Sequence, residues 1–340
     1  MASPAETCAP QRDEMTTPTL PSADLSIVIV NWNGGKLLND CLASIVAHGG
    51  GLNLQGIVID NASRDGSREM AERAFPQFQV INSGTNLGFG KANNLARSLV
   101  KSDFVLFLNP DTVLCENALE RMVEFLRRNP NVGALGCKML YPNGEVQELG
   151  LQYFPTPWKE FLHSLFMSTG TRQWLKRWLP YHDPNHSGYA IKLYGGCLLC
   201  RKQALERVGW FDERYFMYAE DVDLCRAIRD VGWKLYYLSE AKIVHVCGGA
   251  SEKAPSGFSI LMKSESIAKL IRKYQGGLGA LLYRVGTLIA AIVRLLILTL
   301  MSVARLAARR PAHGELDAAF FKYRTLIGWA LGVKRAQIAA

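Results

Sequence analysis

The sequence predicts an α/β fold, a mostly parallel β-sheet covered by helices on both faces. Short apolar runs alternate with helical patterns from Leu25 onward, which is typical of β-α-β units. The chain has 340 residues, of which 49% are hydrophobic, so it can bury a large core. Only 20% of the residues are charged, and the 30 glycines and 14 prolines are too few for collagen-like or low-complexity classes.

The first half of the chain contains four such alternations after a polar tail. Residues 1–24 hold Pro, Thr, Ser and Glu without apolar periodicity and predict a disordered tail. Strands are predicted at four short apolar runs, 25–30, 56–60, 79–82 and 104–108. Helices are predicted between and after them, at 36–46, 64–75, 91–100 and 117–128. The expected result is a parallel sheet that is buried on both faces.

The pattern loosens in the second half. An apolar run at 132–141 ends at the turn Pro142-Asn143-Gly144. Residues 151–190 mix tryptophans and other aromatics with Lys and Arg, and predict an insertion with one or two helices. A strand near 193–200, a helix near 219–231 and a strand near 235–246 complete a domain that we expect to span residues 25–250.

The formal net charge of +9 is confined to the C-terminal part of the chain. Residues 267–340 carry 12 basic and two acidic side chains, so the first 266 residues are close to neutral. A nucleic-acid-binding surface would need basic residues on the folded domain. We therefore expect no nucleic-acid partner.

The eight cysteines are scattered among apolar runs, and no signal-peptide pattern precedes them, which indicates a reducing compartment. Cys197 and Cys200 have the spacing of a zinc or redox pair. They lie in a predicted strand, however, where their side chains would face opposite sides. A metal site at this pair is the less favoured interpretation.

Polar or glycine-rich residues follow the predicted strands. These segments are 31–33, 60–61, 86–90 and 109–111. In open α/β sheets, ligands bind beyond the carboxyl ends of the strands. The four segments are therefore expected to meet around one ligand.

Two of these segments suit a nucleotide. The carboxylate of Asp60 could accept the N3–H of a pyrimidine, although a helix or turn cap explains this residue equally well. The glycines between Gly84 and Gly90 could let the backbone approach a phosphate. The segment is neither G-x-G-x-x-G after the first strand nor a Walker A sequence, which argues against a dinucleotide dehydrogenase and a phosphate-loop NTPase.

Asp111 and His245 are candidate ligands of a divalent cation. Asp111 follows the wholly apolar strand 104–108, and His245 ends the apolar run 235–244. Mg²⁺ and Mn²⁺ prefer oxygen ligands and take few of them from protein when a diphosphate supplies others. The alternatives are a turn aspartate and a structural histidine.

The densest acidic cluster contains Glu220, Asp221 and Asp223 and follows the aromatic run 215–218. Charge placement at a helix N-terminus explains Asp223. It explains two adjacent acids beside aromatic rings less well, because such a setting partly desolvates them and tunes one as a base.

Seven ordered motifs resemble those of family 2 inverting glycosyltransferases. The similarity is greatest to the rhamnosyltransferase-like enzymes of bacterial surface polysaccharide assembly, and it covers about residues 25–250. The motifs are Leu25–Asn33, Val58–Ser63, Asn86–Asn94, Leu108–Asp111, Gly195–Arg201, Phe211–Glu213 and Glu220–Arg226.

The resemblance implies the GT-A fold, a nucleoside-diphosphate sugar donor, Mg²⁺ or Mn²⁺, and a single displacement with inversion. The favoured donor is dTDP-L-rhamnose, and the acceptor is a lipid-linked or cell-envelope glycan. The residues that match donor-binding positions are Asn31, Asn33, Asp60, Asn86, Gly88, Asn109 and Asp111. Asn109 stands where many relatives have the first aspartate of D-x-D, so the site holds one acid fewer.

The resemblance also assigns catalytic, metal and acceptor roles. Asp221 would be the general base, with Glu220 beside it, and Asp111 and His245 would hold the metal. Gly196, Trp158 and Arg226 are expected on the acceptor side, with 151–190 as the acceptor-side insertion. The alternative functions are a sugar nucleotidyltransferase and a non-catalytic, membrane-bound glycan-binding protein.

Residues 251–340 predict a helical, basic, membrane-associating region. Between Leu278 and Ala308 the chain is almost wholly apolar, and its arginines fall on one stripe of a helix. We expect an amphipathic helix at the cytoplasmic face of the inner membrane, with arginines at anionic headgroups. The alternatives are a buried helix or oligomer contact and a tilted spanning helix.

Overall fold

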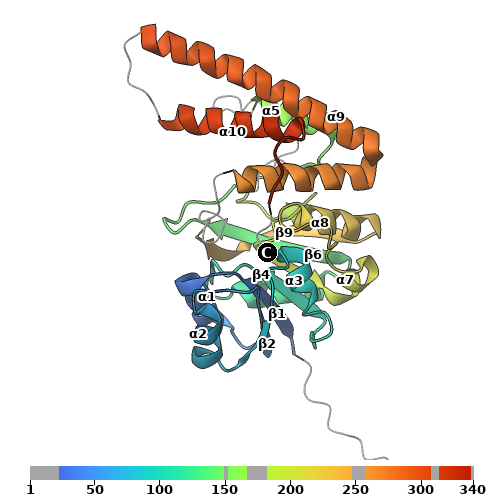
Figure 1. The fold of residues 1–340 in the computed structure, drawn as a ribbon. Helices are drawn as coiled ribbons and strands as arrows, with labels where there is room; N and C mark the ends of the chain where they lie inside the picture. Colours follow the sequence, from blue (N-terminus) through green and yellow to red (C-terminus); the bar gives the residue numbers. More distant parts are fainter. Residues whose placement is uncertain (1–22, 149–151, 167–181, 247–256, 308–313, 338–340) are drawn as a thin grey trace, which may run out of the picture.

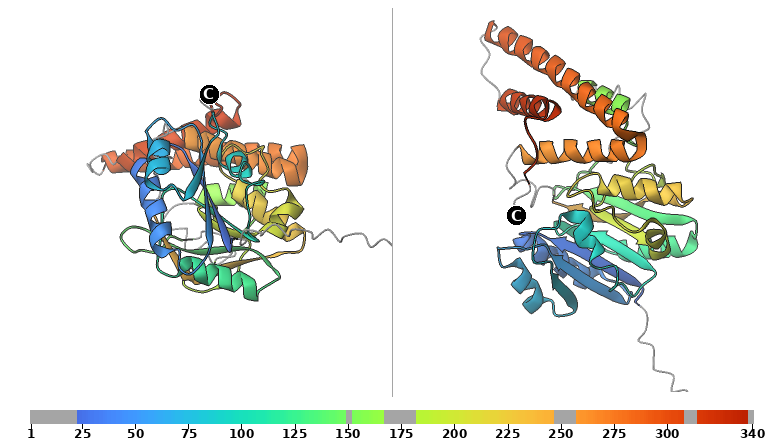
Figure 2. Two further views of the ribbon diagram at one scale, coloured as in Figure 1. Left: turned by 90° about the horizontal axis from the view of Figure 1, so that it is seen from below. Right: turned by 45° about the vertical axis from the view of Figure 1, so that its right-hand side comes forward.

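A computed structural model describes residues 23–148, 152–166, 182–246, 257–307 and 314–337. Nearly all of the predicted tail, and residues 167–181 of the predicted insertion, lie outside the described residues. The described part contains a nine-stranded sheet with helices on both faces (Figure 1). A layer of long helices lies on the side of this domain opposite β2 (Figure 2).

The strands of the sheet follow the order β3-β2-β1-β4-β8-β6-β9-β5, and β7 pairs with β9. Their bounds are β1 Leu25–Asn31, β2 Leu54–Asp60, β3 Phe78–Asn82, β4 Phe104–Leu108, β5 Thr112–Leu114, β6 Val132–Leu140, β7 Gly188–Tyr189, β8 Cys197–Arg201 and β9 Lys234–His245. Strands β1 to β4, β6 and β9 run in one direction, while β5, β7 and β8 run in the other. The sheet is therefore mostly parallel, as predicted.

The helices that pack on the sheet are amphipathic and bury their apolar faces. Their bounds are α1 Gly35–His48, α2 Ser67–Ala74, α3 Phe89–Asn94, α4 Ala118–Arg128, α7 Lys202–Val208 and α8 Glu220–Asp230. One core cluster includes apolar residues of α1 and α4, such as Leu42 and Met122. The other includes Leu205 of α7 and Leu224 of α8. Helix α3 ends at Asn94, earlier than predicted.

Strand β8 places Cys197 and Cys200 in different core clusters. Their side chains thus face opposite sides of the sheet, which confirms the strand interpretation. Both are free thiols. The pair cannot chelate one metal ion.

The chain order creates a topological switch at β1, because β2 and β4 pair with its two edges. The carboxyl ends of these three strands therefore meet at one edge of the sheet. Strand β8 runs antiparallel to β4, so its N-terminal end reaches the same edge. There the Asn109 N–H donates to the Gly196 carbonyl at 3.0 Å.

Helix α9 (Phe258–Ala307) bends at Gly276, where φ is 74°, and so forms two arms. The first arm is tied to the sheet domain by Lys273, whose Nζ lies 2.8 Å from Asp212 and 2.7 Å from Asp223. The second arm packs with α5 (Pro157–Phe166) and α10 (Gly314–Ala330), as Figures 1 and 2 show. Because Asp223 belongs to α8, the Lys273 contact joins the helical layer to that helix.

The second arm is apolar on its outer side. Among the described residues, α9 is the one helix that could cross a membrane by length and composition, with a mean hydropathy of 2.3 in its best window and 22% of that window buried. The large exposed side chains on this arm include Leu278, Leu281, Leu282, Leu296 and Leu300.

The prediction that the arginines of α9 contact lipid headgroups is wrong for two of them. Arg284 donates to the Trp329 carbonyl of α10 at 2.7 Å, and Arg294 donates to the Ser164 carbonyl of α5 at 3.3 Å. These arginines therefore face the neighbouring helices and not lipid headgroups.

Candidate active site

A cavity of about 440 Å³ opens at the edge of the sheet where the strand ends meet. It brings together eight predicted site residues, Asn86, Gly88, Asn109, Asp111, Gly196, Glu220, Asp221 and His245. Trp32, Gln147, Tyr194 and Gly195 also line it. Gln147 was not singled out from the sequence, because it lies beyond the turn after β6 and belongs to no recognisable motif.

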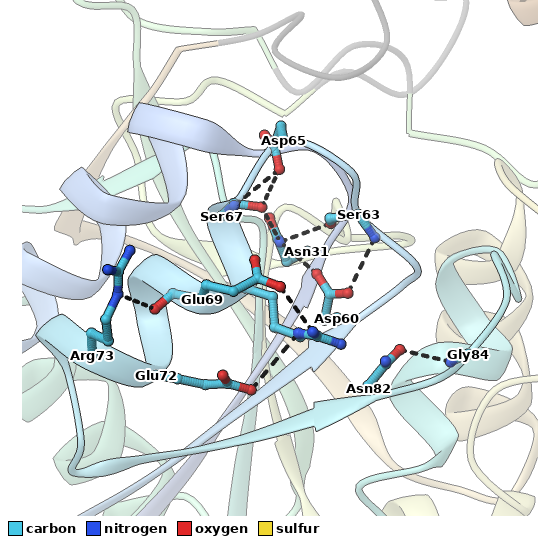
Figure 3. Close-up of polar contacts among 11 residues, drawn as sticks. Asn31, Asp60, Ser63, Asp65, Ser67, Glu69, Glu72, Arg73, Asn82 and Gly84 are labelled. Carbon is cyan, nitrogen blue, oxygen red and sulfur yellow. Dashed lines mark hydrogen bonds and ion pairs between the residues drawn. The ribbon is translucent and has the colours of Figure 1, made fainter.

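Asn31 and Asp60 lie beneath the loop that carries Ser63 and Asp65 (Figure 3). Asn31 Nδ2 donates to Asp60 Oδ1 at 2.9 Å and to Ser67 Oγ at 2.8 Å, and Asp60 Oδ2 accepts from the Ser63 N–H at 3.1 Å. Asp60 is only 1% exposed, and neither residue is among those that line the cavity. The structure therefore shows that both residues position this loop, and their contact with the nucleoside stays a prediction.

Asn33 also stabilises this loop. Its backbone adopts a φ of 52°, and its side-chain oxygen accepts from the Arg64 N–H at 2.8 Å. Like Asn31 and Asp60, it is not among the residues that line the cavity. The three strand-end residues thus join the segments that follow β1 and β2.

The segment from Gly84 to Gly90, which we call the glycine loop, forms one wall of the cavity. Asn86 Oδ1 accepts from Asn61 Nδ2 at 2.8 Å and from the Gly88 N–H at 3.0 Å. Gly88 has a φ of 79°, and the next residue, Phe89, donates its N–H to the Phe216 carbonyl at 2.8 Å. The loop is therefore in backbone contact with the segment that leads to the acidic cluster.

Asp111 and His245 lie together because β5 follows Asp111 and pairs with the end of β9, where Thr112 lies opposite His245. His245 Nε2 is 3.3 Å from Asp111 Oδ1. On the other side of the ring, Nδ1 faces Gln147 Oε1 at 3.0 Å. Gln147 Nε2 donates to the His245 carbonyl at 2.7 Å, and this bond orients the amide so that its oxygen faces the ring.

This arrangement fits a divalent cation. With Nδ1 at the Gln147 oxygen, Nε2 is the ring nitrogen that faces the Asp111 carboxylate. The Nε2 lone pair of a neutral ring and this carboxylate could together hold a cation. No group of three or more His, Cys, Asp or Glu side chains that could hold a metal occurs among the described residues. Diphosphate oxygens and water would have to complete the coordination.

Glu220 and Asp221 enter the cavity from the first turn of α8. The two residues before them, Tyr218 and Ala219, have φ values of 68° and 66°, an uncommon conformation that turns the chain sharply before the helix. Asp221 Oδ2 accepts from the Gly195 N–H at 3.0 Å, and its Oδ1 accepts from the Val222 N–H at 2.8 Å. The carboxylate is therefore held in place from two sides.

Burial of this pair raises the pKa of both acids. Burial, followed by the neighbouring Asp221 charge, raises the pKa of Glu220 to about 8. Burial also raises the pKa of Asp221, while the N–H donors of Gly195 and Val222 oppose this rise. Within the described part of the chain, Glu220 Oε2 is buried without a hydrogen-bond partner. Glu220 therefore retains its proton near pH 7.

Glu220→Gln should stabilise the fold at alkaline pH. The folded protein binds the Glu220 proton between the ordinary value of 4.5 and about 8, so this carboxyl lowers stability as pH rises through that window. We expect urea denaturation to show a gain of about 4 kcal/mol at pH 8.5 and almost none at pH 4.5. The control is Glu116→Gln at an exposed site. A gain of equal size at both pH values would contradict the assignment.

Two predicted acceptor-side residues lie outside the cavity. Trp158 is 64% exposed on α5 and stacks on Phe161. The Arg226 guanidinium lies 3.9 Å from the ring centroid of Tyr274 and 3.6 Å from Asp230. Arg226 therefore joins α8 to α9, and of the three residues predicted on the acceptor side only Gly196 lines the cavity.

The sequence is similar to those of known rhamnosyltransferases. The chain is 31% identical over 242 residues to the N-acetylglucosaminyl-diphospho-decaprenol L-rhamnosyltransferase of Mycobacterium tuberculosis, covering 65% of this chain and 75% of that protein. It is 28% identical over 174 residues to rhamnosyltransferase WbbL of Escherichia coli K12, covering 48% and 62%.

A solved structure supports the fold. The mannosyltransferase PcManGT of Pyrobaculum calidifontis, in complex with GDP-Man and Mn²⁺, superposes with a TM-score of 0.55 over 92% of this chain and 87% of that one, at 14% identity. The predicted GT-A fold is confirmed. The family described as glycosyl transferase family 2 matches residues 26–209. The chain therefore belongs to glycosyl transferase family 2.

Proposed function

We propose that this glycosyltransferase moves L-rhamnose from dTDP-rhamnose to a sugar carried on a lipid diphosphate, with inversion at the anomeric carbon. One observation carries the proposal. A single cavity joins the glycine loop and the Asp111–His245 pair to Asp221. The relatives in Mycobacterium tuberculosis and Escherichia coli are rhamnosyltransferases, which supports rhamnose as the sugar. The family supplies no support for the alternatives of a nucleotidyltransferase or a non-catalytic protein.

In the proposed reaction, Asp221 removes the proton of an acceptor hydroxyl. The oxygen attacks the anomeric carbon from the face opposite the diphosphate, and the bond to the diphosphate breaks with its electron pair. The N–H groups of Gly195 and Val222 hold the Asp221 carboxylate in position during this transfer. The protonated Glu220 adds no second negative charge beside it.

Asp111 and His245 would hold Mg²⁺ or Mn²⁺. A bound cation supplies Lewis-acid stabilisation of negative charge on the departing diphosphate. Gln147 fixes the His245 ring through the two bonds described above. Asn86 and Gly88 shape the wall on which the donor would lie.

A donor panel tests this function. The purified enzyme is incubated with dTDP-, UDP- and GDP-sugars and a short prenyl diphosphate carrying N-acetylglucosamine, with Mn²⁺ or with chelator. We expect transfer from dTDP-rhamnose with inversion, detected by mass and by the anomeric NMR signal. Transfer from another donor alone, or with retention, would contradict the proposal.

We also infer that the second arm of α9 lies on the cytoplasmic face of the inner membrane. The outer side of this arm exposes large apolar side chains that no described element covers. Contact with the acyl region would bury them, and each leucine is worth about 1.5–3 kcal/mol when fully transferred. Attachment would keep the enzyme beside a lipid-linked acceptor.

Leu296→Gln combined with Leu300→Gln should weaken membrane binding. Both side chains are exposed, at 61% and 70%, so the fold should tolerate the change. We expect at least a tenfold lower partition into phosphatidylglycerol vesicles in co-sedimentation. Val46→Gln on α1, also exposed, is the matched control. Equal partition of both proteins would place the membrane contact elsewhere.

A further inference from the structure

Tyr194 places a large aromatic ring in the wall of the candidate active site. Its side chain lines the cavity and is 42% exposed. The residue lies in the segment that leads to β8, directly before Gly195, whose N–H binds Asp221. An exposed aromatic ring in a concave site with a few convergent polar groups is typical of a ligand-binding surface.

The fold fixes the position of Tyr194 relative to the base. The residue before it, Leu193, is buried, and its N–H donates to Cys225 Sγ at 3.3 Å. The residue after it, Gly195, donates its N–H to Asp221 Oδ2 at 3.0 Å. Cys225 and Asp221 lie about one turn apart on α8. The backbone of Tyr194 is therefore held on both sides by the helix that carries the base.

The two glycines after Tyr194 carry the chain from the base to the Asp111–His245 pair. A Cβ added at Gly195 would lie 3.2 Å from the Asp221 Cβ, so the backbone packs directly against the base. A Cβ added at Gly196 would lie 3.8 Å from His245 Cε1. Tyr194 therefore stands at the end of this segment that is next to the base.

We propose that the Tyr194 ring is the platform on which the acceptor sugar lies while Asp221 removes its proton. This inference rests on the proposed function and names a residue that recognises the acceptor. In a displacement with inversion, the incoming hydroxyl and the departing diphosphate lie on opposite sides of the anomeric carbon. The base marks the side of the acceptor, and Tyr194 directly precedes the residue that binds this base.

The chemistry of a pyranose acceptor fits an aromatic platform. A sugar with equatorial hydroxyl groups, such as N-acetylglucosamine, presents axial C–H groups on its faces. The face of a tyrosine ring carries partial negative charge and attracts these C–H groups, which carry partial positive charge. Stacking of this kind leaves the sugar hydroxyls at the edge of the contact, where one of them can reach the Asp221 carboxylate.

Tyr194→Leu and Tyr194→Phe test the proposal. Leucine keeps an apolar side chain but removes the aromatic face, whereas phenylalanine keeps the face and removes the hydroxyl. With N-acetylglucosamine on a short prenyl diphosphate, we expect Tyr194→Leu to raise the acceptor KM about tenfold and to change the KM for dTDP-rhamnose less than about twofold. Tyr194→Phe should keep both KM values close to wild type. Tyr189→Leu on β7, an exposed tyrosine that does not line this cavity, is the matched control.

Three kinetic results would overturn the proposal. The first is an unchanged acceptor KM in Tyr194→Leu. The second is an equal rise in the KM for dTDP-rhamnose, because the ring would then contact the donor. The third is an equal rise of the acceptor KM in Tyr194→Phe, because the hydroxyl and not the ring face would then recognise the sugar.

Direct binding separates failure of this inference from failure of the proposed function. Methyl β-N-acetylglucosaminide is added to wild type and to both variants, and saturation-transfer NMR detects contact of its ring protons with the protein. We expect saturation transfer from wild type and Tyr194→Phe, and loss of most of this signal with Tyr194→Leu. That result would support the platform even if rhamnosyl transfer were not observed. Equal signals from wild type and Tyr194→Leu would overturn it.

Discussion

Asp221→Asn is expected to lower kcat by about 10²–10⁴-fold while donor binding changes little. The amide cannot accept the acceptor's proton, but it has nearly the same shape as the carboxylate. Its oxygen can still accept one of the N–H bonds from Gly195 and Val222 that fix this position. The loss should therefore fall on proton removal and not on the shape of the cavity.

Two measurements separate these effects. Steady-state assays give kcat, and calorimetry with dTDP gives the affinity for the donor's nucleotide. Asp230→Asn, at the other end of α8 and more exposed, is the matched control. Turnover equal to wild type would exclude Asp221 as the base, and a large loss of dTDP affinity would mean that it binds the donor.

The pH dependence of kcat follows from the same residue. Burial raises the pKa of Asp221 above the ordinary aspartate value of 3.8, and only the ionised carboxylate can remove a proton. Activity should therefore decline as pH falls, at a pH above that expected for an exposed aspartate. Glu220→Gln removes the neighbouring acid and should shift this decline.

Strands β1 and β4 could be predicted from the sequence because both are wholly buried. Their residues are apolar apart from Ser26 and Asn31 of β1, and both strands were placed within one residue of their bounds. The reversed direction of β8 could not be predicted. It depends on pairing with β4 and β6 across a long excursion of the chain, and the apolar run of β8 looks the same in either direction.

The candidate site was predictable where strand ends determine position. Asp111 and His245 are distant in sequence, yet each closes an apolar run, and the β5–β9 pairing brings them together. The same signal leaves two roles open for Asp60, because a polar residue at a strand end can serve a loop, as its bond from the Ser63 N–H shows, as well as a ligand. Helical spacing likewise grouped Arg284 and Arg294 correctly, but it could not show that α10 and α5 cover that face.

Gly88→Ala should be the most damaging change in the glycine loop, because both backbone strain and a steric clash act at this position. The backbone has a φ of 79°, and an added Cβ would lie 2.1 Å from the Phe216 carbonyl oxygen, which accepts from the next N–H. Strain and overpacking together predict a loss of about 4 kcal/mol in the free energy of unfolding. The clash should also displace the segment that leads to Glu220, and so lower kcat/KM.

Gly84→Ala isolates the penalty of backbone strain. Gly84 lies in the same loop with a φ of 75°, but an added Cβ there meets nothing within 4 Å. We expect a loss of only about 1 kcal/mol in chemical denaturation, with kcat/KM close to wild type. Similar losses for the two alanine variants would show that backbone strain alone requires glycine here. A much larger loss of stability for Gly88→Ala would show that close contact with Phe216 couples the glycine loop to α8, the helix that carries the base.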